Sequence, residues 1–160
     1  MFRTAFLPAY VLLALTMVGS NATTAHAHCQ VPCGIYGDQL RFQQMLEDQQ
    51  TIAKAQTSIN DLSSGTLDAQ GHNQLARWVV TKEEHAQRIQ TTIAEYFLAQ
   101  RIKPDASNYA KTLMAAHKVI IDAMKCKQSA DPSTAEMLKA SVLDLYRAYE
   151  GKEPLFEHTH

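Results

Sequence analysis

A histidine and two cysteines stand close together in the segment "AHAHCQVPCGIY", residues 25–36. His28 and Cys29 are adjacent, and Cys33 completes a C-x₃-C pattern. A cut after Ala27 would give His28 a free α-amine. His28 and Cys29 then offer the amine, the imidazole, the Cys29 backbone nitrogen and the Cys29 thiolate as metal ligands, and Cys33 adds a second thiolate. These residue types predict a metal site at a new N-terminus.

The donor set indicates which metal such a site would take. The amine and the Cys29 nitrogen close a five-membered chelate ring, and the Cys29 nitrogen and sulfur close another. Two nitrogens and two sulfurs in a plane suit Ni(II) or Cu(II), whereas zinc prefers tetrahedral side-chain ligands. Thiolates and a deprotonated amide stabilise a higher oxidation state, and an axial imidazole favours it further. Pro32 and Gly34 allow the tight turn that brings Cys33 back.

The motif "HCQVPCGIY" resembles the nickel hook of nickel-containing superoxide dismutases, whose mature chains open His-Cys-x-x-Pro-Cys-Gly-x-Tyr. The fixed positions are all present, at His28, Cys29, Pro32, Cys33, Gly34 and Tyr36. The mature length and a four-helix organisation also suit this family. "EYF" and the following "KP" resemble the end of its second helix.

This resemblance implies a role for each hook residue. His28 would give the amine nitrogen and the axial imidazole, Cys29 its backbone nitrogen and thiolate, and Cys33 the second thiolate, all to one nickel ion per subunit. Tyr36 would stand beside the open axial face, where it orders water and limits access to small anions. The implied activity is disproportionation of superoxide to dioxygen and hydrogen peroxide by Ni(III)/Ni(II) cycling. The implied assembly is a homohexamer.

The chain departs from the family pattern behind the hook. The position after the first cysteine is often Asp in the family and is Gln30 here. Family members hold the axial imidazole with a Glu in the first helix and an Arg in the second. These places fall at Gln43 or Gln44 and at His85 in this sequence. We therefore take Gln43, Gln44 and His85 as candidate partners of the imidazole, because such partners set its orientation and basicity.

Three other functions remain open at this point. An exported nickel or copper carrier could use the same hook without turnover. A thiol–disulfide redox protein could use Cys29 and Cys33, although its usual signature is C-x-x-C beside a βαβ unit. A structural bundle with a fortuitous cysteine pair would leave the placement of His28 unexplained. No His-Glu-x-x-His or Cys-x-x-Cys-His motif supports a zinc protease or a c-type haem. None of His72, His85 and His117 has the Glu three residues before it that a di-iron bundle needs.

The first 27 residues predict a cleaved signal peptide. A short basic start precedes the apolar run "FLPAYVLLALTMV", and "AHA" at 25–27 has the form of a signal peptidase site. We expect a processing peptidase to cut after Ala27 and the protein to be periplasmic or extracellular, with a cytoplasmic pro-peptide as the alternative. Residues 28–160 then form one domain, with the hook at 28–36 and a helical bundle over about 38–150.

Composition excludes several partner classes. The formal net charge is −1 and there is no basic run, which argues against nucleic acid and against a polybasic membrane patch on the mature chain. The three cysteines are an odd number, so a disulfide-stapled scaffold is not expected. We expect Cys126 to be a buried apolar residue.

From Asp38 onward the periodicity predicts helices and no strands. We expect helices from Asp38 to about 63, from about 72 to 100, from after Asp105 or Ser107, and from Pro132, capped by Asp131, to Gly151. Short connections then predict an all-α, antiparallel up-down four-helix bundle. The expected core face of the third helix is Leu113, Met114, His117, Ile120, Ile121 and Met124, with His117 as a core histidine.

Overall fold

The computed structural model describes residue 35 and residues 37–155, and in these residues it consists of helices and connecting turns. The helices are α2 (Asp38–Ser63), α3 (Ala69–Thr91), the π-helix η1 (Thr92–Arg101), α4 (Tyr109–Gln128) and α5 (Pro132–Glu150). Because η1 continues α3 directly, the described residues form four rods. This confirms the predicted all-α four-helix bundle, and the predicted hook, residues 28–36, lies outside the described residues apart from Ile35.

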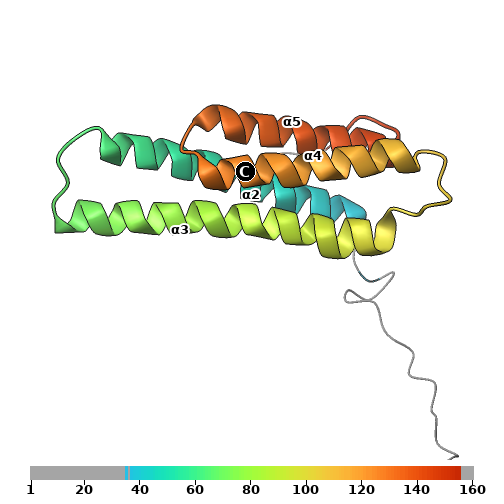
Figure 1. Ribbon diagram of the computed structural model, residues 1–160, viewed down its shortest axis with the longest axis horizontal. Coiled ribbons are helices and arrows are strands. Elements are labelled where there is room, and N and C mark those ends of the chain that lie inside the picture. The colour runs from blue at the N-terminus through green and yellow to red at the C-terminus, as the bar shows by residue number, and fades with distance from the viewer. Residues whose placement is uncertain (1–34, 36, 156–160) are drawn as a thin grey trace, which may run out of the picture.

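The four rods run side by side and alternate in direction (Figure 1). Each of α2 and α4 packs against both α3 and α5, so consecutive helices are neighbours and α5 returns to α2. The hairpin between α2 and α3 reaches past the turn between α4 and α5 (Figure 1). None of the helices in the described part of the chain is long and apolar enough to cross a membrane.

Capping residues explain where the helices begin and end. Asp131 caps α5 by accepting a hydrogen bond of 2.9 Å from the Ser133 backbone N–H, and Pro132 takes the first helical position, as predicted. Gly151 ends α5 in the left-handed conformation, with φ 70°, and its N–H donates to the Arg147 carbonyl. The predicted start of the second helix near residue 72 was wrong by three residues. Its cap is Asp68, which accepts from the Gly71 N–H at 2.7 Å.

The core is apolar along its length and aromatic at the end where α2 begins. Phe42 packs against Phe97, with ring centroids 4.9 Å apart, and against Tyr146 at 5.0 Å. Such tilted and edge-on pairs add to the gain from burial. The other helices bury the rest of the apolar core, at Met45, Ile52, Ile59, Ala86, Ile89, Ile93, Tyr96, Ala135, Leu138, Val142 and Leu145.

The predicted core face of the third helix was wrong. Its buried residues are Thr112, Ala116, Val119, Asp122, Ala123 and Cys126. Leu113, Met114 and Met124 are exposed, and so is His117, which is not a core histidine. Ile120 and Ile121 are only partly buried. Helix α4 therefore turns small or polar side chains inward and its bulkier apolar side chains outward.

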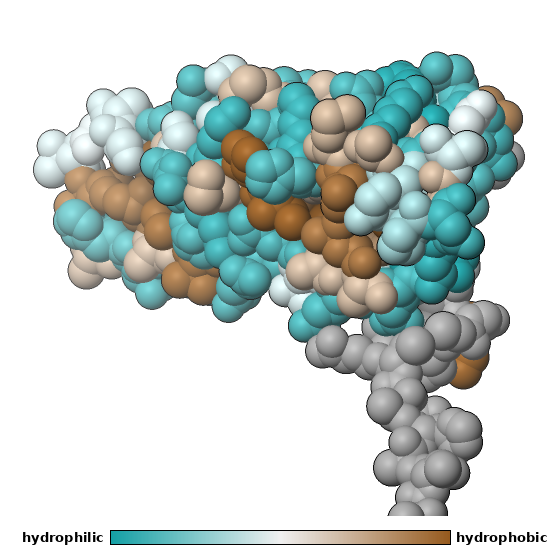
Figure 2. Space-filling view, turned by 45° about the vertical axis from the view of Figure 1, so that its right-hand side comes forward, coloured by the Kyte–Doolittle hydropathy of each residue, from teal (hydrophilic) through white to brown (hydrophobic). Residues whose placement is uncertain are grey.

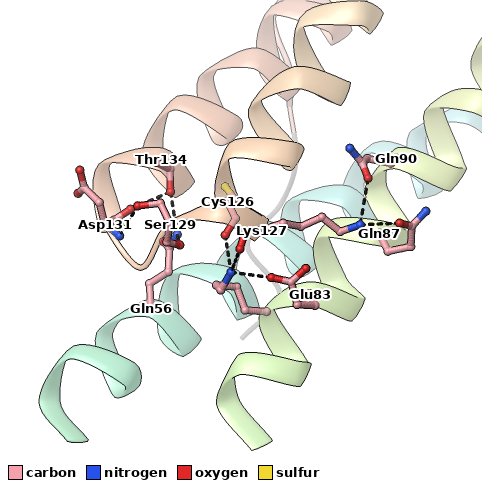
Figure 3. Close-up of polar contacts among 10 residues, drawn as sticks. Gln56, Glu83, Gln87, Gln90, Cys126, Lys127, Ser129, Asp131 and Thr134 are labelled. Carbon is pink, nitrogen blue, oxygen red and sulfur yellow. Dashed lines mark hydrogen bonds and ion pairs between the residues drawn. The ribbon is translucent and has the colours of Figure 1, made fainter. Parts of the chain in front are cut away.

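The C-terminal end of α4 is fixed by side chains of α3. The buried Lys82 ammonium donates to the carbonyl of Cys126 at 2.8 Å, to the carbonyl of Lys127, and to Glu83 at 2.9 Å. The last carbonyls of a helix lack partners within it, so Lys82 satisfies two of them. Figure 3 shows Glu83 and Gln87 of α3 beside Cys126 and Lys127, where the Lys127 ammonium donates to Gln87 at 2.5 Å.

Candidate metal centre

The predicted metal ligands His28, Cys29 and Cys33 lie outside the described residues, and so does Tyr36. The described chain resumes at Gly37, the N-cap residue of α2. The structure therefore describes the bundle that the predicted hook joins. In the described part, no group of three or more His, Cys, Asp or Glu side chains could hold a metal ion.

Asp38, the first residue of α2, accepts hydrogen bonds from three side chains. The Tyr96 hydroxyl donates to Oδ1 at 2.5 Å, the Arg101 Nη2 donates to Oδ2 at 2.6 Å, and the Tyr149 hydroxyl donates to Oδ2 at 2.9 Å. The Asp38 side chain is 15% exposed. Gly37 alone separates Asp38 from Tyr36, so this cluster, the Asp38 cluster, fixes the chain directly after the predicted hook.

The π-helix explains how two residues of one element reach the same carboxylate. In an α-helix, residues five apart point in different directions, because neighbours on one face are three or four apart. In η1 the hydrogen bonds span five residues, as in the bond of 2.8 Å from the Ile102 N–H to the Phe97 carbonyl. Tyr96 and Arg101 are themselves five apart, and this wider turn brings both to Asp38.

Ionisation of the Asp38 cluster favours a negative Asp38 and neutral tyrosines. Burial alone would raise the pKa of Asp38, but the hydrogen bonds from Arg101, Tyr96 and Tyr149 outweigh it and hold that pKa below its ordinary value. Burial and the hydrogen bond to Asp38 raise the pKa of Tyr96 to about 12. The same two causes raise the pKa of Tyr149. The cluster therefore keeps its ion pair and both hydroxyl protons at neutral pH.

His85, a predicted partner of the axial imidazole, lies against Asp48 of α2. Its Nδ1 is 2.7 Å from Oδ1 of Asp48, and Nη2 of Arg88 is 2.7 Å from the same oxygen. The Asp48 and His85 side chains are 15% and 20% exposed, so both are partly withdrawn from water. Asp48 thus orients His85 and holds Arg88 beside it, on the groove between α2 and α3.

The two predicted glutamines differ in their surroundings. Both Gln43 and Gln44 are exposed, but Gln44 accepts a hydrogen bond of 2.9 Å from Nη1 of Arg41 and lines a groove of about 420 Å³. We call it the α2–α3 groove, and its walls are Arg41, Gln44, Glu47, Asp48, Gln87, Arg88, Thr91 and Thr92. Gln43 is not among these residues. The structure thus brings Gln44 and the neighbours of His85 together and leaves Gln43 apart.

Sequence reasoning missed Asp48, Arg88 and the whole Asp38 cluster as parts of the support. Asp48 stands one helical turn after Gln44, and Arg88 stands three residues after His85. That spacing places each pair on one face of its helix, which was the available signal. Although the Arg88 side chain is 53% exposed, it bridges to Asp48.

The third cysteine is withdrawn from any metal chemistry at the surface. Cys126 is fully buried, as predicted, and burial raises the pKa of its thiol. Figure 3 shows its side chain within the bundle between Thr134 and Lys127. An inaccessible thiol that resists ionisation is a poor metal ligand.

Comparison with known protein families gives a match over most of the chain. The family model described as nickel-containing superoxide dismutase matches residues 23–153. The matched segment includes His28, Cys29, Cys33 and Tyr36 and every helix that the structure describes. No curated protein and no solved structure matches the chain.

Proposed function

Since the chain belongs to the nickel-containing superoxide dismutases, a family of oxidoreductases with a nickel cofactor, we propose that its activity resides in the N-terminal hook. In this proposal two superoxide ions and two protons become one dioxygen and one hydrogen peroxide. One superoxide gives up an electron and the other receives it. The bound nickel supplies the one-electron cycling between Ni(III) and Ni(II).

The donor set of the hook fits this metal. His28 would hold nickel through its α-amine and its imidazole, Cys29 through its backbone nitrogen and thiolate, and Cys33 through its thiolate. Nitrogen and thiolate donors in a plane suit nickel, and soft thiolates stabilise its oxidised form. Cys126 is buried, so it does not compete with Cys29 and Cys33 for the metal.

The observation that carries this proposal is the position of the hook motif within the family match. The match begins at residue 23, ahead of His28, and continues to residue 153. It therefore joins the ligand motif and the helical bundle in one family pattern. A fortuitous cysteine pair in front of an unrelated bundle would not be expected to give that result.

The described residues would support the hook from two sides. The Asp38 cluster holds the chain directly after Tyr36, so it limits where Tyr36 and Cys33 can lie. The α2–α3 groove offers Gln44 as a partner for the His28 imidazole, and His85 would be a second partner beside the groove, with its ring fixed by Asp48. Tyr36 would order water beside the nickel site and admit only small anions.

The proposal includes processing and assembly. A peptidase would remove residues 1–27 by cutting after Ala27, which creates the α-amine ligand. The exported protein would be periplasmic or extracellular, and processing of a pro-peptide in the cytoplasm is the alternative. The mature chains would assemble into a homohexamer.

The test uses the natively processed protein. We expect His28 as its first residue, one nickel ion per subunit, and rapid removal of superoxide. A variant that keeps one Ala before His28 should lose nickel and activity, because the amine is then displaced. The matched control adds one Ala after His160 and should keep both. An extended variant that holds nickel and works as well as the wild type would contradict the hook proposal, and a nickel-loaded wild type without turnover would favour a carrier.

A further inference from the structure

Asp48 of α2 has a carboxylate oxygen that no described residue uses. Its Oδ1 lies 2.7 Å from Nδ1 of His85 and accepts from Nε and Nη2 of Arg88 at 3.1 and 2.7 Å. All three contacts end on this one oxygen. Within residues 37–155, Oδ2 of Asp48 has no hydrogen-bond partner, and it is not a buried atom. Because each carboxylate oxygen has lone pairs of its own, Oδ2 can accept from a group outside these residues.

His85 is held at both of its ring nitrogens. Nδ1 lies on Asp48, and Nη2 of Arg88 lies 2.8 Å from Nε2. We assign the ring hydrogen to Nδ1, since Nδ1 then donates to Asp48 and Nε2 accepts from Arg88. Neither nitrogen is left to receive a further N–H. His85 can therefore act on a neighbouring group through Asp48, whose carboxylate it orients.

Two other walls of the α2–α3 groove carry acceptors that are less well prepared. Gln44 is exposed and uncharged, and its Oε1 already accepts from Arg41 at 2.9 Å. Glu47 supplies a second carboxylate, but its side chain is exposed, and no donor in the described part of the chain holds that carboxylate. The Asp48 side chain is 15% exposed and is fixed by His85 and Arg88. Asp48 is therefore the carboxylate of this groove that already has a fixed direction.

Charge and hydropathy narrow the kind of group that fits the groove. Its walls contribute two arginines and two carboxylates, and the Lys127 ammonium adjoins it at Gln87, whose Oε1 it contacts at 2.5 Å. These charges nearly cancel, so the groove favours a neutral hydrogen-bond donor over an anion. Figure 2 shows apolar patches spread over the bundle with polar residues between them, so hydropathy alone does not single out a docking surface. The unused oxygen of Asp48 is the more specific feature.

The N-terminal segment is long enough to reach this oxygen. The groove begins at Arg41, in the first turns of α2, and the Arg41 guanidinium carbon lies 5.4 Å from the centre of the Tyr96 ring in the Asp38 cluster. Asp48 follows Asp38 by ten residues, which is about 15 Å along the helix. His28 precedes Asp38 by ten residues, and ten extended residues span about 33 Å. The chain can therefore turn through the hook and still bring His28 to Asp48.

We propose that Oδ2 of Asp48 accepts a hydrogen bond from the imidazole of His28, while Arg88 and His85 hold the carboxylate in place. A histidine that binds a metal through one ring nitrogen carries a hydrogen on the other, and a carboxylate is a common partner for it. Such a partner fixes the orientation of the ring and makes the imidazole a stronger donor to the metal. The inference rests on the proposed function and names the group that orients one of its ligands. In this assignment His85 acts through Asp48 and not by direct contact.

The test measures nickel release and the Ni(III)/Ni(II) midpoint potential of the processed, nickel-loaded protein. Asp48→Asn keeps the shape of the side chain and removes its charge, so it should release nickel to a chelator about tenfold or more faster than the wild type. Its midpoint potential should rise, because a weaker imidazole donor and the lost negative charge both disfavour the oxidised ion. Arg88→Gln should shift both properties in the same direction by less. The matched control is Asp144→Asn, which also loses a pairing with an arginine, Arg147, and should match the wild type in both.

Each contrary result points to a different failure. A Glu47→Gln variant that changes nickel release as much as Asp48→Asn would assign the bond to Glu47 and overturn the proposal. An active wild type whose Asp48→Asn variant keeps its release rate and potential would overturn the assignment and leave the proposed function standing. A wild type that binds no nickel, or does not begin at His28, would overturn both. If Asp48→Asn does not fold, Arg88→Gln decides, because Arg88 is 53% exposed, and a wild-type release rate would then overturn the proposal.

Discussion

Tyr96 donates its hydroxyl hydrogen to Asp38 over 2.5 Å, although 58 residues separate them in the chain. The bond ties the π-helix η1 to the first turn of α2. Arg101 and Tyr149 reach the same carboxylate, so three rods of the bundle meet directly after the end of the predicted hook.

The Asp38 cluster should make the protein sensitive to acid. The pKa of Asp38 is held below its ordinary value in the folded state, so its stabilising contribution is present above the unfolded pKa of about 4 and is lost as the pH falls toward the folded pKa. Asp38→Asn should lower the melting temperature at pH 7 and flatten its decline below pH 5. Thermal melts from pH 7 to pH 2.5 measure this.

The control for this prediction is Asp144→Asn. Asp144 also pairs with an arginine, but its side chain is 58% exposed, and such pairs contribute little. Its melting curve should follow that of the wild type at every pH. Equal effects of the two substitutions would show that the burial and the three donors of Asp38 do not matter.

The same cluster should limit stability in alkali. Because the folded state raises the pKa of Tyr96 from 10.0 to about 12, its contribution is present below the unfolded value and is lost as the pH rises from 10 toward 12. Tyr96→Phe should be less stable than the wild type at pH 8, by about 1.5–3 kcal/mol for a hydrogen bond to a charged group. The difference should shrink by pH 12. Urea unfolding at both pH values decides this, and a constant difference would contradict it.

Local sequence signals sufficed for most helix ends and most core positions. Asp131, Pro132 and Gly151 bound α5 as predicted, because capping depends on residues within one turn. The η1 segment shows the opposite case. Hydrogen bonds over five residues instead of four leave no distinct pattern in the sequence, so the shared reach of Tyr96 and Arg101 could not be predicted.

The inverted prediction for α4 has a related cause. Periodicity finds an apolar face but does not say which partner covers it. On α4 the bulkier face was taken as the core, whereas Ala116 and Ala123 face the core. The hook ligands could be proposed from the sequence because one continuous motif contains them. Asp48 and Tyr149 were not, since their relation to the site depends on packing between helices.

Lys82 should contribute more to the free energy of unfolding than an exposed lysine does. Its ammonium satisfies the carbonyls of Cys126 and Lys127 at the end of α4. Lys82→Met keeps much of the apolar packing and leaves both carbonyls unpaired, so it should cost about 1–3 kcal/mol of unfolding free energy. Lys139→Met on the exposed side of α5 should stay within about 0.5 kcal/mol of the wild type. Urea titration compares them, and equal losses would contradict the capping role.

The α2–α3 groove predicts a difference between two adjacent glutamines. Gln44 lines the groove and Gln43 does not, although both are exposed. If the groove holds the His28 imidazole, Gln44→Ala and His85→Ala should speed the loss of nickel to a chelator about tenfold or more. They should also alter the electron paramagnetic resonance spectrum of the oxidised protein. Gln43→Ala should change neither property, and equal behaviour of all three variants would contradict a role for the groove.

The Cys126 thiol should not react with alkylating reagents in the folded protein. Its side chain is inaccessible to solvent and to reagents, with an exposed fraction of 0%, and burial raises the pKa of its thiol. Because the thiolate is the reactive form, iodoacetamide at pH 8 should leave Cys126 unmodified for hours in the native protein and modify it within minutes in urea. Peptide mass spectrometry reports the site. Cys126→Ala should retain nickel and activity, and a loss of nickel in a variant that still folds would mean that Cys126 contributes to the metal site.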